Sequence, residues 1–162
     1  IEGLRDLGSA PSPFNSFQTI QGIETLDIRM KKHSENALKL SAWLSTREEV
    51  SWVNYPGLKT SKYNGLAQKY LSKGQSGIVT FGLKKGFEGG KKVADATKLF
   101  ALLANIGDTK SLIIHPASTT HQQLSEAAQK TAGVTQDLIR LSVGLEDIKD
   151  LISDLEVAFE TL

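Results

Sequence analysis

A stripe of apolar residues runs through the first third of the chain with the spacing of a helix. Ser12 and Pro13 suit the N-cap and the first turn, and apolar positions then recur every three or four residues. The members of this face are Ile23, Leu26, Met30, His33, Ala37, Leu40 and Leu44. One continuous helix of about six turns has more apolar face than a small domain covers. We therefore expect its first half to pack on another domain or subunit.

Shorter apolar runs follow, separated by turn-forming residues, and they predict four strands. The strands cover residues 50–56, 77–83, 111–114 and 138–143. Helical spacing predicts further elements over residues 64–71, over residues 87–103 and from near Gln122. A last amphipathic helix should begin at Leu145, with Glu146 and Asp147 favourably placed in its first turn.

The order of these elements predicts an α/β fold with a small, mostly antiparallel sheet and helices on one side of it. We expect an N-terminal segment and a long connecting helix over residues 1–46, and an α/β sandwich domain over residues 47–162. With 40% hydrophobic residues, the 162-residue chain can bury one core and still extend an arm.

Composition narrows the classes of partner. The 19 Lys and Arg residues nearly balance the 18 Asp and Glu residues, so no basic surface for nucleic acid is expected. The absence of cysteine excludes disulfides and thiolate metal sites. No apolar run approaches the roughly 20 residues that span a bilayer, and the first ten residues do not resemble a signal peptide. We therefore expect a cytoplasmic protein with no nucleic-acid or membrane partner.

The last predicted strand contains a charged residue within an apolar run. The period of two directs Ile139, Leu141 and Val143 toward the helices and sends Arg140, together with Ser142, to the opposite face. A guanidinium in this position must be paired or solvated, and its planar fork matches a carboxylate. From the residues alone, three interpretations stay open: an internal salt bridge, a solvated sheet face, or an anionic ligand.

Three histidines invite a metal or acid–base role: His33, His115 and His121. No partners stand at ligand spacing, and HPASTTH is not a zinc motif, so no metal site is expected. We interpret His33, on the apolar helix face, as a packed and hydrogen-bonded side chain. The hydroxyl residues between the other two histidines are expected to turn the chain and cap the following helix: Ser118, Thr119 and Thr120.

The stretch from Ala104 to Gly144 carries a family resemblance. It contains ANIGDTKSLIIHPASTTHQQL and then GVTQDLIRLSVG, and it is similar to the C-terminal part of the cystathionine γ-synthase/Cys-Met metabolism family of PLP-dependent enzymes. The resemblance extends to SPFNSFQTIQGIETLDIRMKKHSENALKLSAWL and VSWVNYPGL before it and to LSVGLEDIKDLISDLEVAFETL after it. It implies the C-terminal small domain of a fold-type I PLP enzyme, without the large domain that binds PLP.

The resemblance also implies roles for individual residues. In this family the arginine of the RLSVG-like strand binds the α-carboxylate of the substrate, and Arg140 occupies that position. Related lyases carry SLG, whose serine helps to hold the same carboxylate, where this chain has NIG. Asn105 is thereby implied as a second substrate-binding residue, although a turn-forming role is equally open. The HPASTTH segment forms a loop at the pocket rim in the family, which implies rim positions for His115, Ser118, Thr119 and Thr120.

Within the family, NIGD and SLIIHPASTTHQQL are closest to the members that convert O-acetyl-L-homoserine and sulfide to L-homocysteine and acetate. The resemblance implies a pyridoxal 5'-phosphate cofactor and a homotetramer. No lysine here stands in the family's Ser-x-x-Lys context, so the lysine that binds PLP is not assigned and the chain alone is expected to be inactive. A γ-lyase or cystathionine γ-synthase portion stays open as an alternative, as does a non-catalytic oligomerisation or interaction domain.

Overall fold

The computed structural model describes residues 1–8 and 10–162. Among these residues, five strands form one sheet in the order β1-β2-β5-β4-β3. The strands are β1 (Val50–Asn54), β2 (Ile78–Leu83), β3 (Ala101–Leu102), β4 (Leu112–Ile114) and β5 (Leu138–Ser142). All neighbours pair antiparallel except β3 and β4, which are parallel. The prediction of a mostly antiparallel α/β sheet is confirmed.

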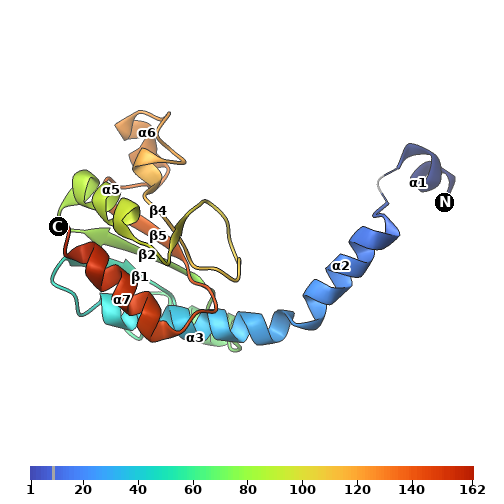
Figure 1. Ribbon diagram of the computed structural model, residues 1–162, viewed down its shortest axis with the longest axis horizontal. Coiled ribbons are helices and arrows are strands. Elements are labelled where there is room, and N and C mark those ends of the chain that lie inside the picture. Colours follow the sequence, from blue (N-terminus) through green and yellow to red (C-terminus); the bar gives the residue numbers. More distant parts are fainter. Residues whose placement is uncertain (9) are drawn as a thin grey trace.

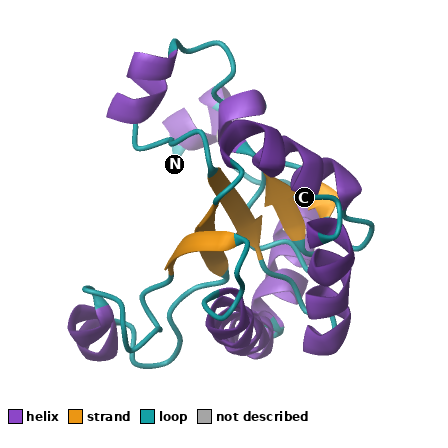
Figure 2. Ribbon diagram, turned by 90° about the vertical axis from the view of Figure 1, so that its left-hand side faces the viewer, coloured by secondary structure: helices purple, strands orange, loops and turns teal. Residues whose placement is uncertain are grey.

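Three helices cover one face of this sheet (Figures 1 and 2): α3 (Leu26–Leu44), α5 (Gly86–Ala96) and α7 (Ile148–Phe159). The core between them consists of alternate strand residues and the apolar faces of the helices, including Phe81, Ile139, Leu141, Leu40 and Leu155, all fully buried. Phe159 connects the helices to the sheet. Its ring stacks on Trp43 with 5.9 Å between ring centroids, and it meets the ring of Phe81 edge-on with 6.3 Å between centroids. Burying each such side chain contributes roughly 1.5–3 kcal/mol.

The N-terminal part of the chain forms an arm that extends away from the sandwich (Figure 1), with α1 (Glu2–Leu7) and α2 (Pro13–Glu24). Ser12 is the predicted N-cap of α2, and its hydroxyl accepts a hydrogen bond from the Asn15 N–H. The prediction of one continuous helix is wrong, because the helix is interrupted at Thr25 between α2 and α3. Gly22 lowers the helix propensity just before this break, and its carbonyl accepts a hydrogen bond from the Arg29 guanidinium.

The arm carries the apolar residues that the sequence left without a partner. In α2 and the start of α3, large apolar side chains are at least 55% exposed at five positions: Phe14, Phe17, Ile20, Ile23 and Ile28. Large exposed apolar side chains in this number are typical of a surface that packs against other protein. No helix within the described ranges combines the length and the apolarity that a membrane crossing requires.

The exposed face leads to a prediction for the 162-residue chain produced on its own. It should self-associate through the arm, because association removes this apolar surface from water. Sedimentation at increasing concentration should show oligomers, and a variant with Phe17→Ser and Ile23→Ser should shift toward monomer. A chain that stays monomeric at high concentration, with the amides of residues 14–30 protected from exchange, would contradict this expectation.

Two helix boundaries differ from the sequence-based expectation. The helix predicted over residues 87–103 ends at Ala96, because the Asp154 carboxylate of α7 accepts the N–H groups of Lys98, Leu99 and Phe100 and holds them outside a helix. The strand β3 then occupies part of the predicted helix. The last helix begins at Ile148, with Asp147 as its N-cap, three residues later than expected.

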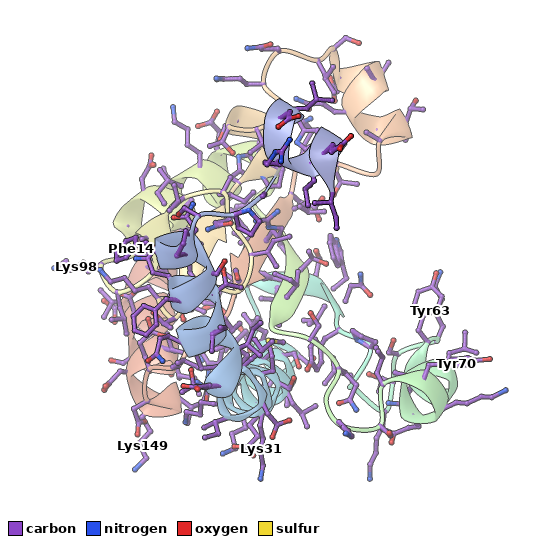
Figure 3. All side chains as sticks on the ribbon, turned by 90° about the vertical axis from the view of Figure 1, so that its right-hand side faces the viewer. Phe14, Lys31, Tyr63, Tyr70, Lys98 and Lys149 are labelled. Atoms are coloured by element: carbon purple, nitrogen blue, oxygen red, sulfur yellow. The ribbon has the colours of Figure 1, made fainter. Side chains whose placement is uncertain are left out.

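Two short helices lie apart from the core. The predicted helix at residues 64–71 is confirmed as α4 (Asn64–Tyr70), and Figure 3 shows Tyr63 and Tyr70 pointing outward from it. The helix expected near Gln122 begins later, as α6 (Glu126–Thr131), with Ser125 as its N-cap. The hydroxyls of Ser118, Thr119 and Thr120 therefore do not cap this helix, and Ser118 ends a short 3-10 helix, η1 (Pro116–Ser118).

Tyr55 provides a pH dependence of stability. Its side chain is fully buried, its hydroxyl donates to the Ser76 carbonyl at 2.9 Å, and burial raises the pKa of Tyr55 to about 12. The folded state favours the neutral phenol. The contribution of Tyr55 to the free energy of unfolding is therefore complete below the unfolded pKa of about 10, and it is lost as the pH rises toward 12. The stability advantage over Tyr55→Phe should shrink by about 1.4 kcal/mol per pH unit above pH 10. Urea unfolding of both proteins at pH 9 and pH 11 measures this difference in the free energy of unfolding. The same difference at both pH values would contradict the prediction.

Candidate functional site

Arg140 lies at the centre of β5, on the face of the sheet that the three helices leave open. Its neighbours in the strand, Ile139 and Leu141, are fully buried against the helices, as the period of two predicts. Across the sheet, Arg140 is paired with Thr80 of β2 on one side and with Ile114 of β4 on the other. The guanidinium is thereby presented from a rigid central strand rather than from a loop.

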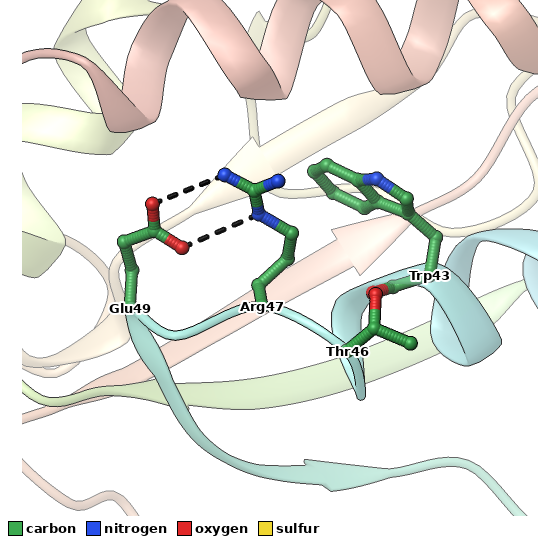
Figure 4. A network of polar contacts seen from close by, with 4 residues as sticks. All are labelled: Trp43, Thr46, Arg47 and Glu49. Atoms are coloured by element: carbon green, nitrogen blue, oxygen red, sulfur yellow. Dashed lines mark hydrogen bonds and ion pairs between the residues drawn. The ribbon is translucent and has the colours of Figure 1, made fainter.

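The guanidinium of Arg140 is only partly used by the protein. Its Nη2 atom donates to the Asn105 carbonyl oxygen at 2.7 Å, whereas its Nε atom is buried without a hydrogen-bond partner. Arg47 shows the contrasting case in Figure 4, where Nη2 and Nε both donate to the Glu49 carboxylate, at 3.1 and 3.3 Å. A buried N–H without a partner carries a desolvation cost of about 1–3 kcal/mol, which an anionic acceptor would remove.

Asn105 lies beside Arg140, but it uses its backbone for this contact. The Asn105 carbonyl accepts from the guanidinium, while its side-chain amide donates to the Asp108 carboxylate at 2.8 Å. The structure thus brings together both residues that the sequence singled out for substrate binding. The amide of Asn105 stabilises the turn that follows it, as expected for a turn-forming asparagine.

A second hydrogen bond joins the same loop to the same strand. The Gly107 N–H donates to the Ser142 hydroxyl at 3.2 Å, and Gly107 adopts a φ of +79°, in the left-handed region that favours glycine. Ser142 and Gly107 also line a cavity of about 350 Å³ between the loop and the N-terminal half of α3. The strand alternation places Ser142 on the face of Arg140, but its bond to Gly107 had no signal in the sequence.

The end of β5 is held in place by a buried polar network. From α3, His33 donates its Nδ1–H to the Val143 carbonyl at 2.6 Å, and Asn36 donates to the carbonyls of Gly144 and Glu146. The Glu146 carboxylate in turn accepts the N–H and the hydroxyl of Ser111. Glu146 was expected in the first turn of the last helix, and it instead joins the end of β5 to the start of β4.

His33 is 1% exposed and hydrogen-bonded, so the interpretation as a packed side chain is confirmed. The described part of the chain contains no group of three or more His, Cys, Asp or Glu side chains arranged to hold a metal ion. Sequence analysis did not identify the contribution of Asn36, Ser111 and Glu146, because residues so far apart in the chain show no shared pattern.

The buried ring of His115 is engaged within the protein. The ring is fully buried, its Nε2 faces the Gln136 carbonyl at 2.9 Å and its Nδ1 faces the Ser118 hydroxyl at 2.8 Å. Because a carbonyl only accepts, Nε2 donates to Gln136, and the Ser118 hydroxyl lies within hydrogen-bond distance of both Nδ1 and the His115 carbonyl. Gly90 packs against this ring so closely that a Cβ atom there would lie 2.5 Å from His115 Cδ2. This histidine therefore has both ring nitrogens engaged.

The hydroxyl residues of the HPASTTH segment hold its backbone and neighbouring rings. Thr119 donates to the His115 carbonyl at 2.8 Å, and the Thr120 hydroxyl contacts His121 Nδ1 at 2.8 Å. Ser118 lines a second cavity of about 440 Å³, between α5 and α6, that is separate from the cavity beside Ser142. The segment begins directly after Ile114, the strand partner of Arg140.

Comparison with known proteins places these features in a family. The sequence profile described as Cys/Met metabolism PLP-dependent enzyme matches residues 2–160. The chain is 55% identical over its full length to an O-acetyl-L-homoserine sulfhydrylase of Leptospira meyeri and 48% identical, over 98% of its length, to O-acetyl-L-homoserine sulfhydrylase 1 of Thermus thermophilus. It is 47% identical, over 99% of its length, to a homocysteine/cysteine synthase of Saccharomyces cerevisiae. The chain spans only 37–38% of the length of these relatives.

Solved structures agree with the sequence relatives. A Campylobacter jejuni protein described as an O-acetylhomoserine (thiol)-lyase, whose crystal structure contains a pyridoxyl-lysine phosphate, matches 97% of this chain with a TM-score of 0.87 and 48% identity. The metB protein of Corynebacterium glutamicum matches 96% with a TM-score of 0.83 and 39% identity. The chain covers 37% and 39% of these two structures.

Proposed function

The chain belongs to the Cys/Met metabolism PLP-dependent enzyme family, and we propose that it is the C-terminal, substrate-carboxylate-binding portion of an O-acetylhomoserine sulfhydrylase. The whole enzyme, meaning the polypeptide of which this chain is a part, converts O-acetyl-L-homoserine and sulfide to L-homocysteine and acetate. The names of relatives at 47–55% identity support this assignment.

The observation that carries the proposal is the unfilled hydrogen-bonding capacity of the Arg140 guanidinium. Its Nε–H is buried and without a partner, and its Nη2 is oriented by the Asn105 carbonyl. Because Nη2 bears two N–H groups, one can remain on Asn105 while the other lies parallel to the Nε–H. We propose that these two donors form a side-on fork for a carboxylate, a pairing that is shorter and stronger than a neutral hydrogen bond.

In this proposal, the fork fixes the α-carboxylate of the amino-acid substrate and thereby orients its Cα–H bond. Orientation of this kind contributes several of the roughly 7–11 kcal/mol that positioning can remove from a barrier. The overall exchange breaks the Cγ–O bond, with acetate as the leaving group, and forms a Cγ–S bond to the sulfur of sulfide. Arg140 stays charged throughout, because a guanidinium does not lose its proton in proteins.

The cofactor chemistry depends on other groups. Pyridoxal phosphate, when bound, supplies an electron sink that makes the protons near the amino-acid nitrogen acidic. Arg140, oriented by the Asn105 carbonyl, fits the carboxylate of a substrate held on that cofactor. The Asn105 amide is already engaged with Asp108. We propose that the lysine and the phosphate-binding groups come from the region of the relatives that this chain does not span, and that the chain alone is inactive.

The remaining expectations belong to the same proposal. Residues 1–46 act as arm and connecting helix and residues 47–162 as the C-terminal domain. The exposed apolar face of α2 supports burial against the large domain or a neighbouring subunit in a homotetramer. The segment from His115 to Thr120 contributes to the rim of the pocket, and the enzyme works in the cytoplasm.

A direct experiment tests the proposal. The purified whole enzyme should be yellow, with an absorption that borohydride abolishes, and it should form homocysteine when supplied with O-acetylhomoserine and sulfide. A colourless protein that binds no pyridoxal phosphate would favour the non-catalytic interaction domain. A yellow protein that releases an oxo acid and ammonia from the amino acid without consuming sulfide would favour a γ-lyase.

A further inference from the structure

We propose that Ser142 is a positioning residue, which holds the loop of residues 105–107 in the geometry that orients the Arg140 guanidinium. This inference rests on the proposed role of Arg140 in binding a carboxylate. Ser142 itself need not touch the substrate, because its effect passes through the loop. It would therefore determine substrate affinity through a hydrogen bond made within the protein.

The loop is attached to β5 at two matching points. Arg140 donates to the Asn105 carbonyl at 2.7 Å, and Gly107 donates to the Ser142 hydroxyl at 3.2 Å. Arg140 and Ser142 are two residues apart on the strand and share one face, and their partners are two residues apart on the loop. The loop consequently runs alongside the strand, and each attachment fixes the position of the other.

Little else holds this loop. Asn105, Ile106 and Gly107 are all exposed, and the Ile106 side chain is 68% exposed, so the segment has little apolar burial. The side chains of Asn105 and Asp108 bond each other within the turn. Among the hydrogen bonds of the described residues, the Arg140–Asn105 and Gly107–Ser142 bonds are the ones that join residues 104–108 to the sheet.

Ser142 is suited to this task because its own position is fixed. The residue is 2% exposed and stands in β5 between the backbone pairings to β2 and β4. The carbonyl of the next residue, Val143, is held by His33. Without the Ser142 hydroxyl, the Gly107 N–H would turn to water, Asn105 would shift, and the unpaired Nε–H of Arg140 would lose its fixed direction.

The test uses three variants of the whole enzyme with its cofactor. Ser142→Ala removes the acceptor, and Ser142→Thr retains a hydroxyl with a methyl group that the adjacent cavity can hold. Ser51→Ala is the matched control, since Ser51 also lies on a strand and its hydroxyl contacts only Asp137, at 3.4 Å. We expect Ser142→Ala to raise KM for O-acetylhomoserine about three- to tenfold, the range of one neutral hydrogen bond. The kcat should change less than about twofold, and Ser142→Thr and Ser51→Ala should match the wild type.

A second measurement reports on the loop without relying on activity. Hydrogen exchange followed by mass spectrometry should show faster exchange in the peptide spanning residues 103–110 for Ser142→Ala, and a return to the wild-type rate for Ser142→Thr. An unchanged KM in Ser142→Ala, an unchanged exchange rate, or a Ser142→Thr enzyme that behaves like Ser142→Ala would each overturn the inference. A wild-type enzyme that does not act on O-acetylhomoserine would instead refute the proposed function, and the exchange rates would still show whether Ser142 holds the loop.

Discussion

Replacing Arg140 by lysine in the whole enzyme should lower kcat/KM for O-acetylhomoserine by about 10- to 150-fold. Lysine keeps the positive charge, but it cannot present two parallel N–H donors to a carboxylate. The loss is that of a charge-assisted hydrogen bond, about 1.5–3 kcal/mol. The Nε–H of Arg140, buried and unpartnered in the protein, is the donor that the substitution removes. Steady-state kinetics at saturating sulfide measure the effect.

The pyridoxal phosphate content of Arg140→Lys should equal that of the wild type, because the proposed cofactor groups lie outside this chain. Arg47→Lys is the matched control. Arg47 pairs with Glu49 and its guanidinium lies over the Trp43 ring at 5.4 Å (Figure 4), so its replacement should cost at most about 1 kcal/mol of stability and leave kinetics unchanged. Wild-type kinetics in Arg140→Lys would remove this arginine from the site.

The second large effect concerns the sulfur acceptor. Sulfide should outcompete cysteine by at least about two orders of magnitude in kcat/KM, the size of a lost charge-assisted pair. Cysteine brings its own carboxylate and ammonium, and both would be desolvated without partners unless the pocket supplied charged groups. The proposed rim, residues 114–122, contains no Lys, Arg, Asp or Glu. Its histidine at 115 is fully buried, with both ring nitrogens engaged.

A competition assay decides between the two acceptors. The whole enzyme is given O-acetylhomoserine with equal concentrations of sulfide and cysteine, and homocysteine and cystathionine are counted. Comparable rates of formation of the two products would contradict the sulfhydrylase assignment and favour a cystathionine γ-synthase. Such a result would leave the role of Arg140 intact, because both reactions begin with the same amino-acid carboxylate.

Features of the site were predictable from the sequence only where they depend on a single strand or helix. The direction of Arg140 follows from the alternation within a single strand, and the structure has Ile139 and Leu141 buried behind it. The Arg140–Asn105 and Gly107–Ser142 bonds each join residues 35 positions apart and use backbone atoms, which have no sequence signature. The family resemblance placed Asn105 near the arginine, but not through its carbonyl.

Helix ends show the same limit. Ser12 acts on its own helix, so its capping role is local and the prediction holds. The end of α5 depends on Asp154, whose carboxylate reaches Lys98 from 56 residues away. Apolar spacing alone continues the helix past that point, because it does not include a competing acceptor on another element. The strand β3 has only two residues, too few to show a period.

The buried polar network between α3 and the end of β5 restricts the position of the helix on the sheet. Apolar surfaces tolerate sliding, whereas the His33 and Asn36 side chains meet three particular carbonyls. Sliding α3 by one turn, about 5.4 Å, would leave these carbonyls and both side chains buried without partners, at about 1–3 kcal/mol each. These hydrogen bonds therefore fix the position of α3 relative to the strand that carries Arg140. We therefore expect any displacement of the first half of α3 to move the strand that carries Arg140 with it.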